Sequence, residues 1–129
     1  MMKIIYTLFS CLIFTSCFNI ERNCNDYKTG TFQFNYMEDG VEKTGKFVRT
    51  EAYSIDYFEG KIDSSSVRWI NDCEFILTNL HPKSNQEKRS IHMKIISTSK
   101  NSYTFEYKYA VKEGNRPDRV VKGIAKKIE

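Results

Sequence analysis

The sequence lacks any apolar run long enough to cross a bilayer. Its longest, residues 4–14, has 11 residues, whereas a spanning helix requires roughly 20. Histidine is scarce, with two residues, and the four cysteines do not fall at the short paired spacings of a structural zinc site. The chain has no nucleophile elbow, no internal repeat and no low-complexity segment. These absences argue against a transmembrane helix, a metal site and an enzyme.

The N-terminus has the order of an export signal. Lys3 supplies a positive charge, the apolar run follows, and Thr15-Ser16 are small residues directly before Cys17. This order resembles the lipobox of bacterial lipoproteins, although Phe14 stands where that motif usually has Leu. The resemblance implies that residues 1–16 are removed and that Cys17 is acylated. A plain secretory signal is the alternative.

Cys11 is a rival lipid acceptor, but it would leave an apolar run of only seven residues before the cut. Several acyl chains on Cys17 would anchor the protein stably without a spanning segment. Phe18 follows Cys17, so the Asp that marks inner-membrane retention is missing. We therefore expect an exported protein that is lipid-anchored to the outer membrane, on the periplasmic face.

The remaining cysteines form a natural pair. With Cys11 removed and Cys17 acylated, Cys24 and Cys73 are left, and two cysteines in an exported domain predict one disulfide. Free buried thiols are the alternative. A metal site is disfavoured because the two cysteines are far apart in sequence and neither histidine complements them.

Residues 17–26 are expected to form a short tether, and residues 27–129 a single domain made of strands. Aromatic residues alternate with polar ones in two segments, and five others show weaker alternation or short apolar runs. No window of twelve residues has a helical stripe. The predicted strands are residues 31–36, 53–57, 67–70, 73–77, 91–95, 103–109 and 120–128.

Seven or eight short strands with regular turns predict an all-β antiparallel barrel or sandwich. A lipocalin-like meander is favoured, because Thr29-Gly30-Thr31-Phe32 resembles the glycine-aromatic start of such barrels.

The mature chain also resembles small, uncharacterised lipoproteins of the Bacteroidota. Residues 67–74, Val-Arg-Trp-Ile-Asn-Asp-Cys-Glu, carry the most specific part of this resemblance, together with Asn23-Cys24 and residues 94–96. The resemblance implies a lipid anchor followed by a small domain, and it implies no activity.

Charge is unevenly distributed along the chain. Residues 17–80 hold 7 basic and 11 acidic side chains, whereas residues 81–129 hold 12 basic and 5 acidic ones. A basic half could meet anionic lipid or an acidic partner. The favoured interpretation is that strands of the two halves alternate around the barrel, so that the charges intersperse.

The aromatic stripe Tyr103, Phe105, Tyr107 and Tyr109 is the most prominent candidate ligand or interface surface. It is more typical of a buried strand face than of a nucleic-acid platform, and export would remove nucleic acid from reach. A DNA topoisomerase activity has no support, since strand cleavage needs metal-binding acids and a DNA-sized surface. Arg68-Trp69 is a second candidate interface, with Trp69 favoured as a core anchor near the disulfide.

The other polar residues that could form a site are more simply interpreted as surface residues. His81 and His92 have no motif partner, and Ser64-Ser65-Ser66 reads as a Ser-rich turn. The acidic residues Asp56, Glu59 and Asp63 lack calcium-loop spacing and are expected in a solvated turn.

The sequence thus predicts a lipid-anchored, non-catalytic β-domain that needs no cofactor. Its role would be structural, through contact with an envelope protein. The alternative is a carrier of a small apolar ligand.

Overall fold

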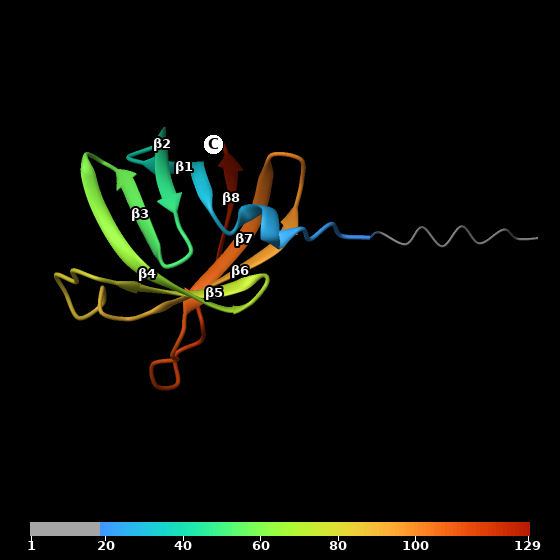
Figure 1. Ribbon diagram of the computed structural model, residues 1–129. Coiled ribbons are helices and arrows are strands. Elements are labelled where there is room, and N and C mark those ends of the chain that lie inside the picture. Colours follow the sequence, from blue (N-terminus) through green and yellow to red (C-terminus); the bar gives the residue numbers. More distant parts are fainter. Residues whose placement is uncertain (1–18) are drawn as a thin grey trace, which may run out of the picture.

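A computed structural model describes residues 19–129, which form eight strands and one short 3-10 helix (Figure 1). The signal segment, Cys11 and Cys17 lie outside the described residues. The elements are η1 (Cys24–Tyr27), β1 (Gly30–Glu38), β2 (Val41–Arg49), β3 (Tyr53–Phe58), β4 (Lys61–Asn71), β5 (Glu74–Asn79), β6 (Ile91–Thr98), β7 (Ser102–Tyr109) and β8 (Val121–Lys127).

The strands form a closed barrel in which each strand pairs antiparallel with the next and β8 returns to β1. The predicted all-β class and meandering barrel are therefore confirmed, and a sandwich is excluded. Inward side chains alternate with outward ones, as the aromatic patterns of β1 and β7 predict. On β3 the apolar set Tyr53, Ile55 and Tyr57 faces outward instead. Two longer loops, residues 80–90 and 110–120, project from the body of the barrel (Figure 1).

Strand β2 is the one strand that sequence patterning does not predict. Its first half, Glu42-Lys43-Thr44-Gly45, has no apolar alternation. The inward position opposite Phe34 is Gly45, where an added Cβ would lie 2.3 Å from the Phe34 ring. The ring of Phe34 thus fills the space inside the barrel that an apolar side chain at position 45 would otherwise occupy.

Strand β4 is longer than predicted and includes the serines expected in a turn. Ser64 and Ser65 pair with Ile55 and Ser54 of β3. The turn at residues 71–73, in contrast, lies where the sequence predicts it, with Asn71 Oδ1 accepting a hydrogen bond from the Cys73 amide at 2.9 Å.

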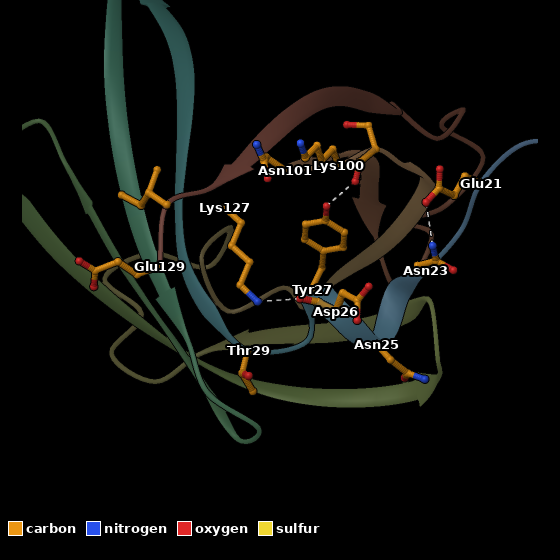
Figure 2. A pocket seen from close by; sticks show the side chains of 12 residues that line it. Glu21, Asn23, Asn25, Asp26, Tyr27, Thr29, Lys100, Asn101, Lys127 and Glu129 are labelled. Atoms are coloured by element: carbon orange, nitrogen blue, oxygen red, sulfur yellow. Dashed lines mark hydrogen bonds between the residues drawn. The ribbon is translucent and has the colours of Figure 1, made fainter.

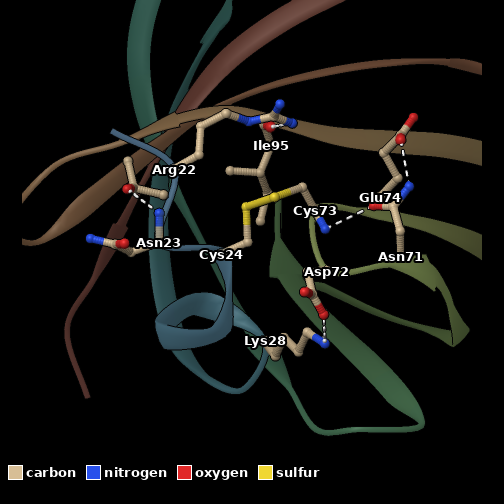
Figure 3. Close-up of a disulfide and its surroundings, with 10 residues drawn as sticks. Arg22, Asn23, Cys24, Lys28, Asn71, Asp72, Cys73, Glu74 and Ile95 are labelled. Atoms are coloured by element: carbon tan, nitrogen blue, oxygen red, sulfur yellow. Dashed lines mark hydrogen bonds and ion pairs between the residues drawn. A yellow bond between two sulfur atoms is a disulfide. The ribbon is translucent and has the colours of Figure 1, made fainter. Parts of the chain in front are cut away.

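One end of the barrel is closed by η1, which a disulfide joins to the β4–β5 turn (Figure 3). The Cys24–Cys73 bond predicted from the cysteine count is present, with 5.3 Å between the Cα atoms. Cys24 and Tyr27 belong to the buried core, and Arg22 donates a hydrogen bond to Ile95 O. Residues assigned to the tether from sequence are therefore integral to the domain.

Arg49, on β2, holds this closed end together from within. Its side chain is 3% exposed, and it donates hydrogen bonds to the carbonyls of Tyr27 and Lys28 and to the Tyr103 hydroxyl. Its guanidinium carbon lies 4.7–5.8 Å from the centroids of five aromatic rings: Phe32, Phe47, Trp69, Phe75 and Tyr103. Aromatic faces and carbonyl oxygens stabilise a buried cation in place of water.

The meander does not intersperse the charges as expected. Because strand order follows the sequence, the acidic half occupies β1–β5 as one continuous arc and the basic half occupies β6–β8. Local compensation still occurs, since Glu74, Lys94, Glu106 and Lys122 lie opposite one another in register across β5–β8. Opposite charges across strands are favourable, so this row is balanced.

Replacing Arg49 tests its role at the closed end. Arg49→Lys keeps the charge but cannot reach three acceptors at once, so buried oxygens lose their partners. We expect the free energy of unfolding to fall by about 2–3 kcal/mol in urea titrations. Arg68→Lys, an exposed residue of β4, is the matched control and should change stability by less than about 0.5 kcal/mol. Equal stability of the two variants would contradict this role.

Candidate functional site

The half of the barrel beyond Arg49 contains a cavity of about 490 Å³. Apolar and aromatic side chains from seven strands form most of its wall, and Arg49 and Ser54 lie at its deep end. The apolar lining residues are Phe34, Tyr36, Phe47, Phe58, Leu77, Ile91, Met93, Phe105, Tyr107 and Val121. A cavity of this volume lies within the range of small-molecule sites.

The aromatic stripe of β7 points into the barrel along its whole length. Tyr103 is 1% exposed and belongs to the core, Phe105 and Tyr107 line the cavity, and Tyr109 lies at its outer rim. The predicted buried face is therefore observed, but its outer part borders space instead of packed side chains. Gly123 of β8 makes room for this arrangement, since an added Cβ would lie 2.6 Å from the Phe105 ring.

Two carboxyl groups also face the interior. Asp56 and Asp63 lie opposite each other in register on β3 and β4, while Glu59 occupies the turn between these strands. The expectation of a single solvated acidic turn is wrong for the two aspartates, because both stand at inward positions of strands. Neither forms an ion pair with another residue of the described range.

Burial raises the pKa of Asp56 to about 6, because its carboxylate is poorly hydrated. The negative charge of Asp63 adds to this rise, whereas a hydrogen bond from the Ser54 hydroxyl and the positive charge of Arg49 oppose it. Near neutral pH Asp56 therefore places a negative charge at the border of the cavity, and this residue loses its charge on mild acidification.

The mouth of the barrel carries charged side chains among apolar ones and continues from the cavity. A hollow of about 340 Å³ shares Asp56, Phe58, Leu77 and Ile91 with the cavity and extends to Asp63, Glu87 and Arg89. The 80–90 loop is held there by Gln86, which donates to the Tyr109 hydroxyl at 2.8 Å, and by Arg89, which pairs with Glu113 at 3.2 Å.

Arg68 and Trp69 do not form a joint site. Arg68 is exposed on the outside of β4, whereas Trp69 packs against the core at the closed end, with its ring 4.5 Å from Phe75. The preference for Trp69 as an anchor near the disulfide agrees with this position. Its indole Nε1 is buried without a hydrogen-bond partner.

Two of the hollows on the outside of the barrel are polar. The larger, about 660 Å³, is a polar depression beside η1 where Tyr27 donates to Ser99 O and Lys127 to Asp26 O (Figure 2). The smaller, about 220 Å³, contains His92 and Glu74, whose side chains approach to 3.0 Å. Its lining includes no serine, threonine or cysteine that could act as a nucleophile.

The candidate general bases are thus separate from the cavity. His92 faces outward on β6, and His81 lies exposed in the 80–90 loop. Within residues 19–129, no three His, Cys, Asp or Glu side chains gather in a geometry suited to a metal ion.

Sequence patterning does not identify Arg49 or Asp56 as interior residues. Both lie on strands whose neighbouring residues are mixed in polarity, and only the register shows which way they face. The one available signal for Asp56 is Phe58, which lies two residues later and therefore on the same face of the strand. It is the only apolar residue among Ser54, Asp56 and Phe58.

Comparisons with known proteins do not assign this barrel to a family. No family model, no curated protein and no solved structure matches the chain. In the part of the chain that the structure describes, no helix has both the length and the apolarity needed to cross a membrane.

The raised pKa of Asp56 predicts a specific pH dependence of stability. A raised carboxyl pKa means that the folded state binds the proton more tightly, so Asp56 costs stability increasingly as the pH rises from about 4 to about 6. Asp56→Asn should therefore match the wild type at pH 4 and exceed its free energy of unfolding by about 1–2 kcal/mol at pH 7. Urea titrations at both pH values measure this difference.

Glu51→Gln, an exposed residue in the β2–β3 turn, is the control for removal of one negative charge. If the wild type and Asp56→Asn had the same free energy of unfolding at pH 7, the Asp56 carboxylate would be well solvated and the prediction would be wrong.

Proposed function

We propose that this protein is a lipid-anchored carrier that binds a small apolar ligand inside its barrel. The observation that supports this proposal is the open-ended cavity of about 490 Å³, lined mainly by aromatic and aliphatic side chains. At about 30 Å³ per molecule, such a cavity holds roughly 16 waters, and an apolar wall makes few hydrogen bonds to them. An apolar ligand would replace this water favourably.

The shape of the barrel favours binding over catalysis. The closed end is rigidly filled by Arg49, its aromatic neighbours and the disulfide, whereas the other half keeps its space. The histidines are outside the cavity, and the Ser54 hydroxyl, which donates to Asp56 at 3.4 Å, has no histidine beside it to act as a base. The cavity therefore suits retention of a ligand.

An interaction role with an envelope protein, the first expectation from sequence, stays a prediction. Nothing about the outer surface singles out a partner as specifically as the cavity indicates a ligand. The two roles are compatible, since a carrier delivers its ligand to another component.

The anchor belongs to the same proposal. The lipobox-like residues 14–17 support acylation at Cys17, and the disulfide agrees with an oxidising compartment outside the cytoplasm. We place the carrier on the periplasmic face of the outer membrane, where a lipid-held protein would exchange apolar ligands with a bilayer.

A fluorescence titration tests ligand binding. The purified full chain should bind cis-parinaric acid, a polyene fatty acid whose emission rises in an apolar site, with saturation at one molecule per chain. Met93→Trp places extra volume inside the cavity and should weaken binding at least about tenfold. Ile62→Trp, which also introduces a tryptophan but at an outward position of β4 that is 67% exposed, should bind as the wild type does. Equal binding by both variants would refute a ligand site in the barrel.

Acyl labelling tests the anchor. Cys17→Ser should abolish incorporation of a clickable palmitate analogue in bacterial cells and release the protein from the membrane fraction. Cys11→Ser is the matched control and should retain both labelling and membrane association. The opposite pattern would make Cys11 the acceptor.

A further inference from the structure

The barrel is not sealed equally along its seams. Strand β1 pairs with β2 over its whole length, from Gly30 with Arg49 to Glu38 with Val41. Its ladder with β8, which backbone hydrogen bonds between Thr31 and residues 128–129 extend toward the closed end, covers residues 32–34, opposite Lys127 to Ala125. Beyond this point residues 35–38 of β1 and 121–124 of β8 face each other as unpaired edges, each bonded only to its other neighbour.

The cavity reaches the surface at this seam. Besides inward residues, its lining includes Asn35, Lys122 and Ile124, which stand at outward positions of β1 and β8. A groove of about 620 Å³ on the outside of the same seam shares Phe34, Asn35, Gly123 and Ile124 with the cavity. Inner and outer spaces therefore meet at these residues.

The passage combines apolar and polar side chains: Phe34 and Ile124 are apolar, whereas Gln33, Asn35 and Lys126 are polar or charged. Gly123 contributes no side chain, and Ile124 is 62% exposed although it is aliphatic. Phe34 lies on the opposite strand at the same level. An apolar chain could cross here in contact with apolar atoms, whereas the mouth of the barrel is bordered by Asp56, Asp63 and Glu87.

The charges at the two openings differ in sign. Lys122 lines the cavity at the seam and Lys126 lines the outer groove, with the amides of Gln33 and Asn35 beside them. Neither lysine is ion-paired with a residue of the range 19–129, although Glu106 stands opposite Lys122 in register on β7. Among the residues that line the hollow at the mouth, the one cation, Arg89, is paired with Glu113.

From this arrangement we propose that the ligand is a single-chain anionic amphiphile that enters between β1 and β8. Its apolar chain occupies the cavity, and its head group stays at the seam near Lys122 and Lys126. The acidic mouth disfavours the reverse orientation, because an anionic head would lie against Asp56 and Asp63. This inference rests on the proposed carrier function and adds the class and orientation of the ligand.

Head-group recognition is tested by comparing cis-parinaric acid with its uncharged methyl ester. The double variant Lys122→Glu/Lys126→Glu should weaken binding of the acid roughly tenfold at low ionic strength, while the affinity for the ester stays the same. The control Lys88→Glu/Lys100→Glu changes net charge equally at two exposed residues outside the seam and should leave both affinities unchanged. Equal loss for acid and ester, or equal effects of the two double variants, would overturn the head-group assignment.

The route is tested by closing the seam. Continuing the register beyond Phe34 and Ala125 places Asn35 opposite Ile124, so Asn35→Cys/Ile124→Cys should form a crosslink across the opening. In stopped-flow mixing we expect uptake of both probes to slow at least tenfold relative to Asn35→Ser/Ile124→Ser. Ile55→Cys/Ser64→Cys, across the paired β3–β4 seam, leaves Asn35 intact; it is the crosslinked control and should load at the wild-type rate.

The outcomes separate the two proposals. Unchanged uptake by the crosslinked seam would show that the ligand enters through the mouth and would overturn the route, while binding blocked by Met93→Trp would still support a carrier. Failure of both probes to bind the wild type would overturn the carrier function and the ligand class together.

Discussion

The burial of one guanidinium among aromatic rings determines how this barrel is built. Arg49 has no carboxylate in contact, so its charge is stabilised by two carbonyls at the end of η1, by the Tyr103 hydroxyl and by the surrounding rings. Because these acceptors come from different parts of the chain, satisfying the cation fixes η1 across the barrel end. The disulfide then holds the same helix from its other side. A buried charge of this kind is costly unless all of its partners are in place, so the closed end is specified sharply.

A consequence of this closed end is that the barrel has two dissimilar halves. Around Arg49 the inward residues are large, and Phe32, Phe75 and Ile95 are completely buried. Beyond it, glycine replaces a side chain at two inward positions, β1 and β8 separate, and the strands enclose space. The packed half provides stability, and the hollow half is free to differ in shape without endangering the fold. This division is what allows a domain of this size to hold a cavity.

Most of the fold could be predicted from alternating side chains, but the candidate site could not. Segments such as residues 31–36 and 103–109 carry large aromatics at every second position, and that pattern has few solutions other than a strand with one buried face. Strand β2 could not be predicted, because its inner face consists of Gly45, Phe47 and Arg49, and only Phe47 is both apolar and large. The inward orientation of Asp56 could not be predicted for a related reason. A polar side chain is expected to face solvent, whereas the position of a residue on its strand determines which way the side chain faces. The cavity depends on where the β1–β8 pairing stops, and no local sequence feature records the length of a pairing between distant strands.

The position of Trp69 gives the molecule an internal optical probe. It is the only tryptophan in the chain, and it lies at the closed end, between the ammonium of Lys28 at 5.0 Å and the guanidinium of Arg49 at 5.8 Å. Trp69 does not line the cavity, so its emission should respond to loosening of η1 and hardly at all to a molecule bound in the other half. Intrinsic fluorescence can thus follow the integrity of the scaffold while an extrinsic dye follows occupancy, which makes the two halves of the barrel separately observable in one sample.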